Sequence, residues 1–240
     1  TPRPTMLRTL ALIASLALPG LTLAQAAEAP RPGIDYQEIT PAQPLFGPPG
    51  KIEVAEVFSY HCIHCADFQP HINRWKARLP ADVRLTYVHA AFGGAIDNLA
   101  RGFYAAETLG ATERTHDAFF NAFHVERKIK TGSLEEVADV YAGLGLDRKK
   151  LLETMNSFGV TSKVNRAKQF AQRTGVNATP TVVVNGRYRV SATADRGFEG
   201  MIRTIDFLVA RERAAQARPA APAAAAAPAA ARPAPAPAGR

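Results

Sequence analysis

The clearest pattern in the chain is a run of β-branched and aromatic residues at 51–60, KIEVAEVFSY, which has no polar face and is typical of a buried strand. The next segment has apolar residues at helical spacing and predicts a helix; they are Phe68, Ile72, Trp75 and Leu79. Residues 83–92, VRLTYVHAAF, form a second predicted strand. Strand, helix and strand in this order predict a parallel β-α-β unit.

A helical region follows this unit. Each of its segments has an apolar stripe, and several begin with Thr, Ser or Asp and end with Gly, which are helix start and stop signals. The predicted helices cover 96–110, 112–125, 133–145, 147–159 and 161–175. Residues 181–190 then predict a hairpin whose turn is Asn185-Gly186. A final helix is expected from about Gly197 to Arg213.

The N-terminal segment has the order of a secretory signal. From Met6, the expected start, a positive charge at Arg8 precedes an apolar stretch, and Ala24-Gln25-Ala26 offers a cleavage site after Ala26. We therefore expect residues 1–26 to be a signal peptide, with a retained N-terminal anchor as the alternative. Residues 27–50 are expected to carry one short strand near 34–39.

The other end of the chain changes composition abruptly. Residues 215–240 are dominated by alanine and proline, and the repeated prolines interrupt what polyalanine would otherwise form as a helix. We expect an extended, disordered tail there.

The composition of the whole chain of 240 residues, at 47% hydrophobic and 21% charged, is that of a globular protein. The formal net charge of +8 could suggest a nucleic acid partner. However, the basic residues are scattered, and no basic run is interleaved with aromatic residues. We therefore expect no nucleic-acid binding.

The chain has two cysteines, Cys62 and Cys65, in the stretch FSYHCIHCADF. A bridge between them would close a very short loop and would stabilise the fold little, so its use is expected to be chemical. A zinc site built on this stretch would need His61 and His64, and ligands from such a short run cannot surround a tetrahedral ion. The more distant histidines that would have to help show no metal-ligand spacing; they are His71, His89, His116 and His124.

A c-type haem would need histidine directly after the second cysteine, where the chain has Ala66. We therefore expect neither a metal nor a cofactor, and predict a redox pair. At the junction of strand and helix, Cys62 would lie beside the free N–H groups of the helix start, which favour a thiolate. Cys65 would lie one turn further in, more buried, and would be the resolving sulfur.

These features together resemble the DsbA family of bacterial periplasmic thiol oxidants. The resemblance is carried by EVFSYHCIHC, the helical region and GVNATPTVVVNGRY, and covers about Ile34 to Arg213. It implies an α/β thioredoxin fold at 51–94 and 175–214. A helical domain at 95–174 would be inserted between the β-α-β unit and the C-terminal β-hairpin and helix.

The resemblance also implies roles for neighbouring residues. His64 would stabilise the Cys62 thiolate by a hydrogen bond or a partial positive charge. Thr179 and Pro180 would form a loop with a cis peptide bond that faces the redox-active disulfide Cys62–Cys65, and Glu56 would be the buried acid beneath it. Two departures stand out: Ile63 occupies a position where the family most often has proline, and many relatives carry an aliphatic residue in place of Thr179.

A periplasmic, monomeric enzyme is therefore expected, which donates its disulfide to newly exported cysteine-containing proteins. By resemblance, a DsbB-like quinone-linked membrane protein would reoxidise it. Two alternatives remain open. One is an isomerase or reductase that uses the same dithiol, and the other is a chaperone or binding module that has no redox chemistry.

Overall fold

The computed structural model describes residues 29–217, so the expected signal peptide, its start at Met6 and the tail from residue 218 onward lie outside the described residues. A five-stranded sheet forms the centre of the molecule, in the order β1-β5-β4-β2-β3. The strands are β1 Tyr36–Glu38, β2 Ile52–Phe58, β3 Val83–His89, β4 Thr181–Val184 and β5 Tyr188–Val190. Strands β2 and β3 are parallel, as predicted, and the other pairs are antiparallel.

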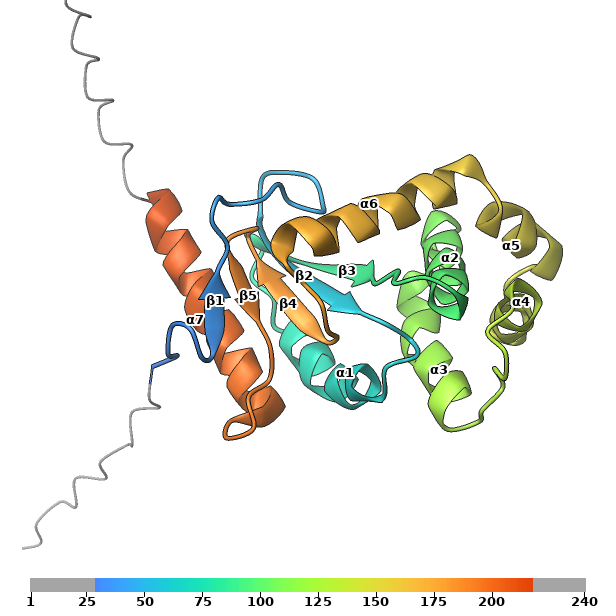
Figure 1. Ribbon diagram of the computed structural model, residues 1–240, viewed down its shortest axis with the longest axis horizontal. Coiled ribbons are helices and arrows are strands. Elements are labelled where there is room, and N and C mark those ends of the chain that lie inside the picture. Colours follow the sequence, from blue (N-terminus) through green and yellow to red (C-terminus); the bar gives the residue numbers. More distant parts are fainter. Residues whose placement is uncertain (1–28, 218–240) are drawn as a thin grey trace, which may run out of the picture.

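Helices cover both faces of this sheet (Figure 1). They are α1 Ile63–Lys76, α2 Ala95–Thr108, α3 Thr112–His124, α4 Leu134–Gly143, α5 Arg148–Met155, α6 Phe158–Thr174 and α7 Gly197–Ala217. Helices α1 and α7 share one apolar cluster with the strands, to which Val54, Ile72, Val182 and Ile205 belong. A second cluster joins the opposite face to the helices inserted between β3 and β4. None of the helices in the described range combines the length and apolar character needed to cross a bilayer.

Several helix boundaries differ from the predicted ones, most of them by one or two residues. Helix α5 ends at Met155 and α6 begins at Phe158, because the Ser157 side chain accepts a hydrogen bond from the Val160 N–H and caps α6. Helix α1 ends at Lys76, before Leu79. Helix α7 continues to Ala217, so residues 215–217, expected in the tail, are helical.

The predicted hairpin joins β4 to β5. Asn185 and Gly186 have φ values of 50° and 67°, the left-handed conformation that a tight Asn-Gly turn requires. A side chain at position 186 would also meet the Gln43 carbonyl oxygen, 2.0 Å from the place of its Cβ. The turn therefore fixes β5 beside the N-terminal segment and brings the start of β4 next to the end of β2, where the cysteines lie.

Candidate active site

Cys62 is the N-cap residue of α1, directly after the loop that leaves β2. Its backbone is extended, with φ −84° and ψ 114°, and its carbonyl oxygen accepts hydrogen bonds from the N–H groups of Cys65 (3.1 Å) and Ala66 (3.3 Å). The first N–H groups of a helix have no partner within the helix, so they are available to a sulfur at this position. The chain therefore places Cys62 where negative charge is favoured.

Both thiols are free, so the structure corresponds to the reduced protein. The pKa of Cys62 is lowered from its ordinary value of 9.0 to about 5. The largest cause is a hydrogen bond from the Cys65 thiol; the Thr179 side chain and the backbone N–H groups of Cys65 and His64 add to it, while partial burial opposes it. At neutral pH Cys62 is therefore a thiolate, the reactive form of cysteine.

Cys65 shows the opposite behaviour one helical turn away. Its side chain is fully buried. Burial raises its pKa far above the usual range, and the hydrogen bond to Cys62 acts in the same direction. One sulfur of the pair therefore carries the charge and the other holds the proton.

The loop before β4 faces the pair from a distant part of the sequence. The Thr179–Pro180 peptide bond is cis. In its thiol form, Cys62 Sγ donates to the Thr179 carbonyl oxygen across 3.2 Å, a contact between residues 117 positions apart. Sheet pairing between β2 and β4 produces this approach, because Val57 pairs with Thr181.

Glu56 lies on β2, on the face of the sheet that α1 covers, since it shares that face with Val54. It is fully buried, and neither carboxyl oxygen has a hydrogen-bond partner within the described residues. Burial, followed by the negative charge of Asp117, raises the pKa of Glu56 to about 8. The group is therefore protonated at neutral pH and can supply a proton.

His64 lies at the surface of the site, one residue before Cys65. The side chain is 73% exposed, and its Nδ1 lies 3.8 Å from Asp67 Oδ2. It is the backbone N–H of His64, not its ring, that helps to lower the pKa of Cys62. Ile63, the first residue of α1, is 50% exposed.

Three histidines make polar contacts with Tyr60. The sequence analysis did not predict these contacts. The Tyr60 N–H donates to His89 Nε2 (3.2 Å), its carbonyl oxygen accepts from His124 Nε2 (2.8 Å), and its hydroxyl lies 3.0 Å from His116 Nδ1. Burial lowers the pKa of His89 to about 4 and that of His116 to about 3, so both rings are neutral at neutral pH. These contacts fix the loop just before Cys62.

The histidines come from β3 and α3, and only tertiary packing assembles them. In the sequence they were visible only as isolated residues without metal-ligand spacing. Within residues 29–217, no group of three or more His, Cys, Asp or Glu side chains is arranged to hold a metal ion.

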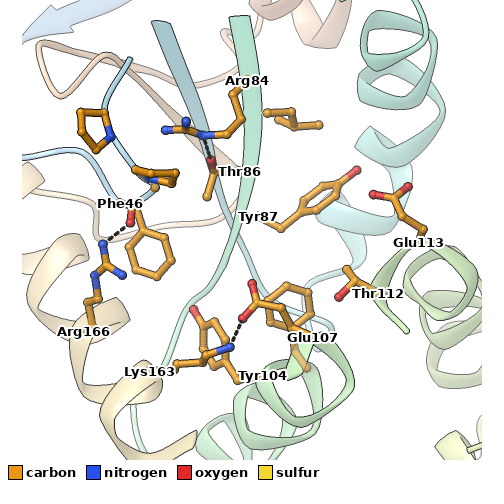
Figure 2. Close-up of a pocket in the computed structure, with 15 residues that line it drawn as sticks. Phe46, Arg84, Thr86, Tyr87, Tyr104, Glu107, Thr112, Glu113, Lys163 and Arg166 are labelled. Atoms are coloured by element: carbon orange, nitrogen blue, oxygen red, sulfur yellow. Dashed lines mark hydrogen bonds and ion pairs between the residues drawn. The ribbon is translucent and has the colours of Figure 1, made fainter. Parts of the chain in front are cut away.

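A large cavity, of about 810 Å³, lies away from the cysteines, between the free edge of β3, helices α2 and α6 and the loop at 46–49 (Figure 2). It shares no lining residue with the cysteine motif or the Thr179–Pro180 loop. Its basic groups are already engaged: Lys163 with Glu107, Arg84 with Thr86, and Arg166 with the Phe46 carbonyl oxygen. The larger hollow is therefore separate from the residues that surround the two thiols.

Comparison with known proteins identifies the family of this chain. A DSBA-like thioredoxin domain matches residues 53–199. The chain is 40% identical to the thiol:disulfide interchange protein DsbA of Pseudomonas aeruginosa, over 87% of this chain and 99% of the relative. It is 38% identical to DsbA of Azotobacter vinelandii, over 77% of this chain and 85% of the relative.

Solved structures agree. The oxidoreductase DsbA from Xylella fastidiosa superimposes with a TM-score of 0.70 at 42% identity, over 75% of this chain and 96% of that one. DsbA of Pseudomonas aeruginosa gives a TM-score of 0.73 at 39% identity, over 78% and 97%. The predicted α/β thioredoxin fold with its helical insertion is thereby confirmed. The chain belongs to the DsbA family of thiol:disulfide oxidoreductases.

Proposed function

We propose that the protein donates a Cys62–Cys65 disulfide to newly exported cysteine-containing polypeptides in the periplasm. The observation that carries this proposal is the opposite pKa shift of the two thiols, with Cys62 lowered to about 5 and Cys65 raised far above the usual range. A stable Cys62 thiolate favours the reduced protein, so its disulfide is a strong oxidant. Each pKa unit corresponds to about 1.4 kcal/mol, or about 30 mV for a two-electron couple.

The reaction would proceed by two exchanges. A substrate thiolate attacks Cys62 Sγ, the bond between the two sulfurs breaks, and Cys65 leaves and takes up a proton. A second substrate thiolate then attacks the substrate sulfur of the mixed disulfide, and Cys62 leaves as a thiolate. The substrate loses two electrons and gains a disulfide, while the protein gains them and becomes a dithiol.

Several residues would support these steps. Glu56, protonated at neutral pH, would supply the proton to Cys65. The backbone of Thr179, held by the cis bond to Pro180, would pair with an extended substrate beside Cys62. Ile63 and the exposed ring of His64 would contact substrate, and His64 would adjust the charge near Cys62 when protonated.

The protein would act as a monomer and would be reoxidised by a DsbB-like quinone-linked membrane protein. Of the two alternatives, an isomerase or reductase would use the same dithiol kept in reduced form. A chaperone without redox chemistry would keep its function when Cys62 is replaced by serine.

The deciding experiment is redox equilibration of the purified protein against mixtures of reduced and oxidised glutathione. We expect a potential well above the value of about −270 mV typical of a cytosolic thioredoxin. A potential as reducing as that value would contradict the oxidant function and favour a reductase. The Cys62→Ser variant serves as the control, because it cannot form the disulfide.

A further inference from the structure

A cleft of about 390 Å³ opens between α1 and α3, beginning at the residue that follows Cys62. Two large apolar side chains stand exposed at its rim: Ile63 is 50% exposed and Val125 is 72% exposed. Exposed apolar side chains that flank a hollow indicate a contact surface for another molecule. Because Ile63 belongs to the cysteine motif, any molecule in this cleft would lie beside the reacting sulfur.

The wall of the cleft is largely apolar, and its charged groups at neutral pH include two carboxylates, beside the imidazole of His124. Ala66, Pro70 and Phe120 form the wall, while Asp67 and Asp117 are exposed carboxylates. Among the described residues that line the cleft there is no lysine or arginine. The large cavity at the edge of β3 differs, because it does contain a lysine and arginines, and these are paired with acceptors in that cavity.

These carboxylates keep free acceptor capacity. Asp117 accepts one hydrogen bond, from Asn73 Nδ2 at 2.7 Å. Among the contacts of residues 29–217, Asp67 has only the long one of 3.8 Å with His64. A carboxylate has about four lone-pair sites, so both groups can accept further donors from a ligand.

Gln69 provides a second, independent sign of a missing partner. It lines the cleft and is only 5% exposed, yet neither its side-chain nitrogen nor its oxygen has a hydrogen-bond partner within residues 29–217. Buried amide groups are nearly always hydrogen-bonded, so this one calls for water or a ligand. Its oxygen adds an acceptor to the two carboxylates.

We propose that the cleft is a substrate subsite that takes a lysine or arginine side chain close to the reacting cysteine. The aliphatic stem of such a side chain would lie on Ile63, Phe120 and Val125, and its charged end would reach Asp67 and Asp117. The protein as a whole carries a net charge of +8 and repels basic peptides, so the preference must come from these local carboxylates. This inference rests on the proposed function, since it concerns the substrate of the same disulfide.

The test compares dithiol peptides in which one position holds lysine, norleucine or glutamate. Separate sets of peptides place this position before or after the reacting cysteine, at different distances from it. The oxidised protein reacts with each peptide and, as a reference, with dithiothreitol. At one or more positions we expect kcat/KM to be about threefold higher for lysine than for norleucine, and lower for glutamate than for norleucine. Raising the salt from about 20 to about 500 mM should remove the difference.

Substitutions locate the effect. Asp117→Asn and Asp67→Asn should each reduce the ratio of lysine to glutamate rates. Asp139→Asn, which removes an exposed charge on α4 outside the cleft, should leave the ratio unchanged. The ratio cancels any change in the reactivity of Cys62, and thermal unfolding checks that each variant is folded.

Two outcomes would overturn the proposal separately from the function. Equal rates for lysine, norleucine and glutamate at every position would overturn the subsite while leaving the oxidant intact. Equal rates for lysine and norleucine, both above glutamate, would show apolar contact without charge recognition and would also overturn it. Failure to oxidise either dithiothreitol or any peptide would overturn the proposed function, and the subsite with it.

Discussion

Cys62 and Cys65 lie on one turn of α1, yet their surroundings act on them in opposite directions. Cys62 occupies the helix N-cap, half-buried, with N–H groups and the Thr179 side chain as donors. Cys65 is fully buried and loses the hydration that a thiolate needs. The spacing of the motif alone therefore does not determine reactivity. One helical turn separates a position that favours the charged thiolate from a position that disfavours it.

The largest effect is expected from removing each sulfur in turn. Cys62→Ser should abolish disulfide donation, because no electrophilic sulfur remains exposed. Cys65→Ser should instead accumulate a mixed disulfide with a substrate that carries a disulfide: the Cys62 thiolate attacks that bond and releases one substrate thiolate, and no Cys65 thiol is left to resolve the product. Non-reducing electrophoresis of each variant with a disulfide-bonded substrate protein distinguishes the two. Equal trapping by both single variants would contradict the division of roles between the sulfurs.

The second effect concerns the Cys62 thiolate. In the reduced protein its absorbance at about 240 nm should titrate with a midpoint near pH 5, the pKa of Cys62. Cys65→Ala should raise this pKa, because the largest stabilising hydrogen bond comes from the Cys65 thiol. An unchanged midpoint in that variant would assign the low pKa to the helix start and Thr179 alone.

The same shift makes the stability of the reduced protein depend on pH. The pKa of Cys62 is about 5 in the folded protein, below its ordinary value of 9.0. Between these two pH values the folded state therefore binds fewer protons than the unfolded state. The contribution to stability is therefore complete above about pH 9, declines as the pH falls, and is absent below about pH 5. Urea unfolding of the reduced and oxidised forms across this window measures it. If the oxidised form were more stable than the reduced form at pH 7, the stabilising effect of the Cys62 thiolate would be contradicted.

A smaller effect is expected beneath the pair, at Glu56. Its pKa is raised from 4.5 to about 8 in the folded protein, so the folded state binds more protons and loses stability as the pH rises through that range. Glu56→Gln removes this dependence. We expect the variant to gain about 3 kcal/mol in free energy of unfolding at pH 7, and nothing below about pH 4.5. A constant difference at all pH values would instead indicate a packing effect.

The smallest effect is expected at Ile63. It is the first residue of α1, where proline is favoured, and its N–H is not among the groups that lower the pKa of Cys62. Ile63→Pro should therefore leave that pKa nearly unchanged and raise the free energy of unfolding by at most about 1 kcal/mol. Ile63→Ala serves as the control for loss of the side chain. A large shift in the titration midpoint would show that the Ile63 N–H or the rigidity of the turn contributes.

Local patterns were sufficient for most of the fold. Alternating and helical apolar spacings predicted the strands, the inserted helices and the Asn185-Gly186 turn, because each depends on residues close together in the sequence. The boundary between α5 and α6 was wrong, since Ser157 acts as a cap and the apolar pattern does not reveal which of several polar residues does so. The fold class was correct because the order of these elements is itself informative.

The site divides in the same way. Local sequence patterns were enough to place the two cysteines at a strand–helix junction, with Cys62 at the helix start and Glu56 on the buried strand before it. Helix geometry and strand alternation are properties of a short segment. Only the tertiary structure brought Thr179 to Cys62, gathered three histidines around Tyr60 and formed the acidic cleft between α1 and α3. Those contacts join elements far apart along the chain, and their positions depend on how the helical insertion packs against the sheet.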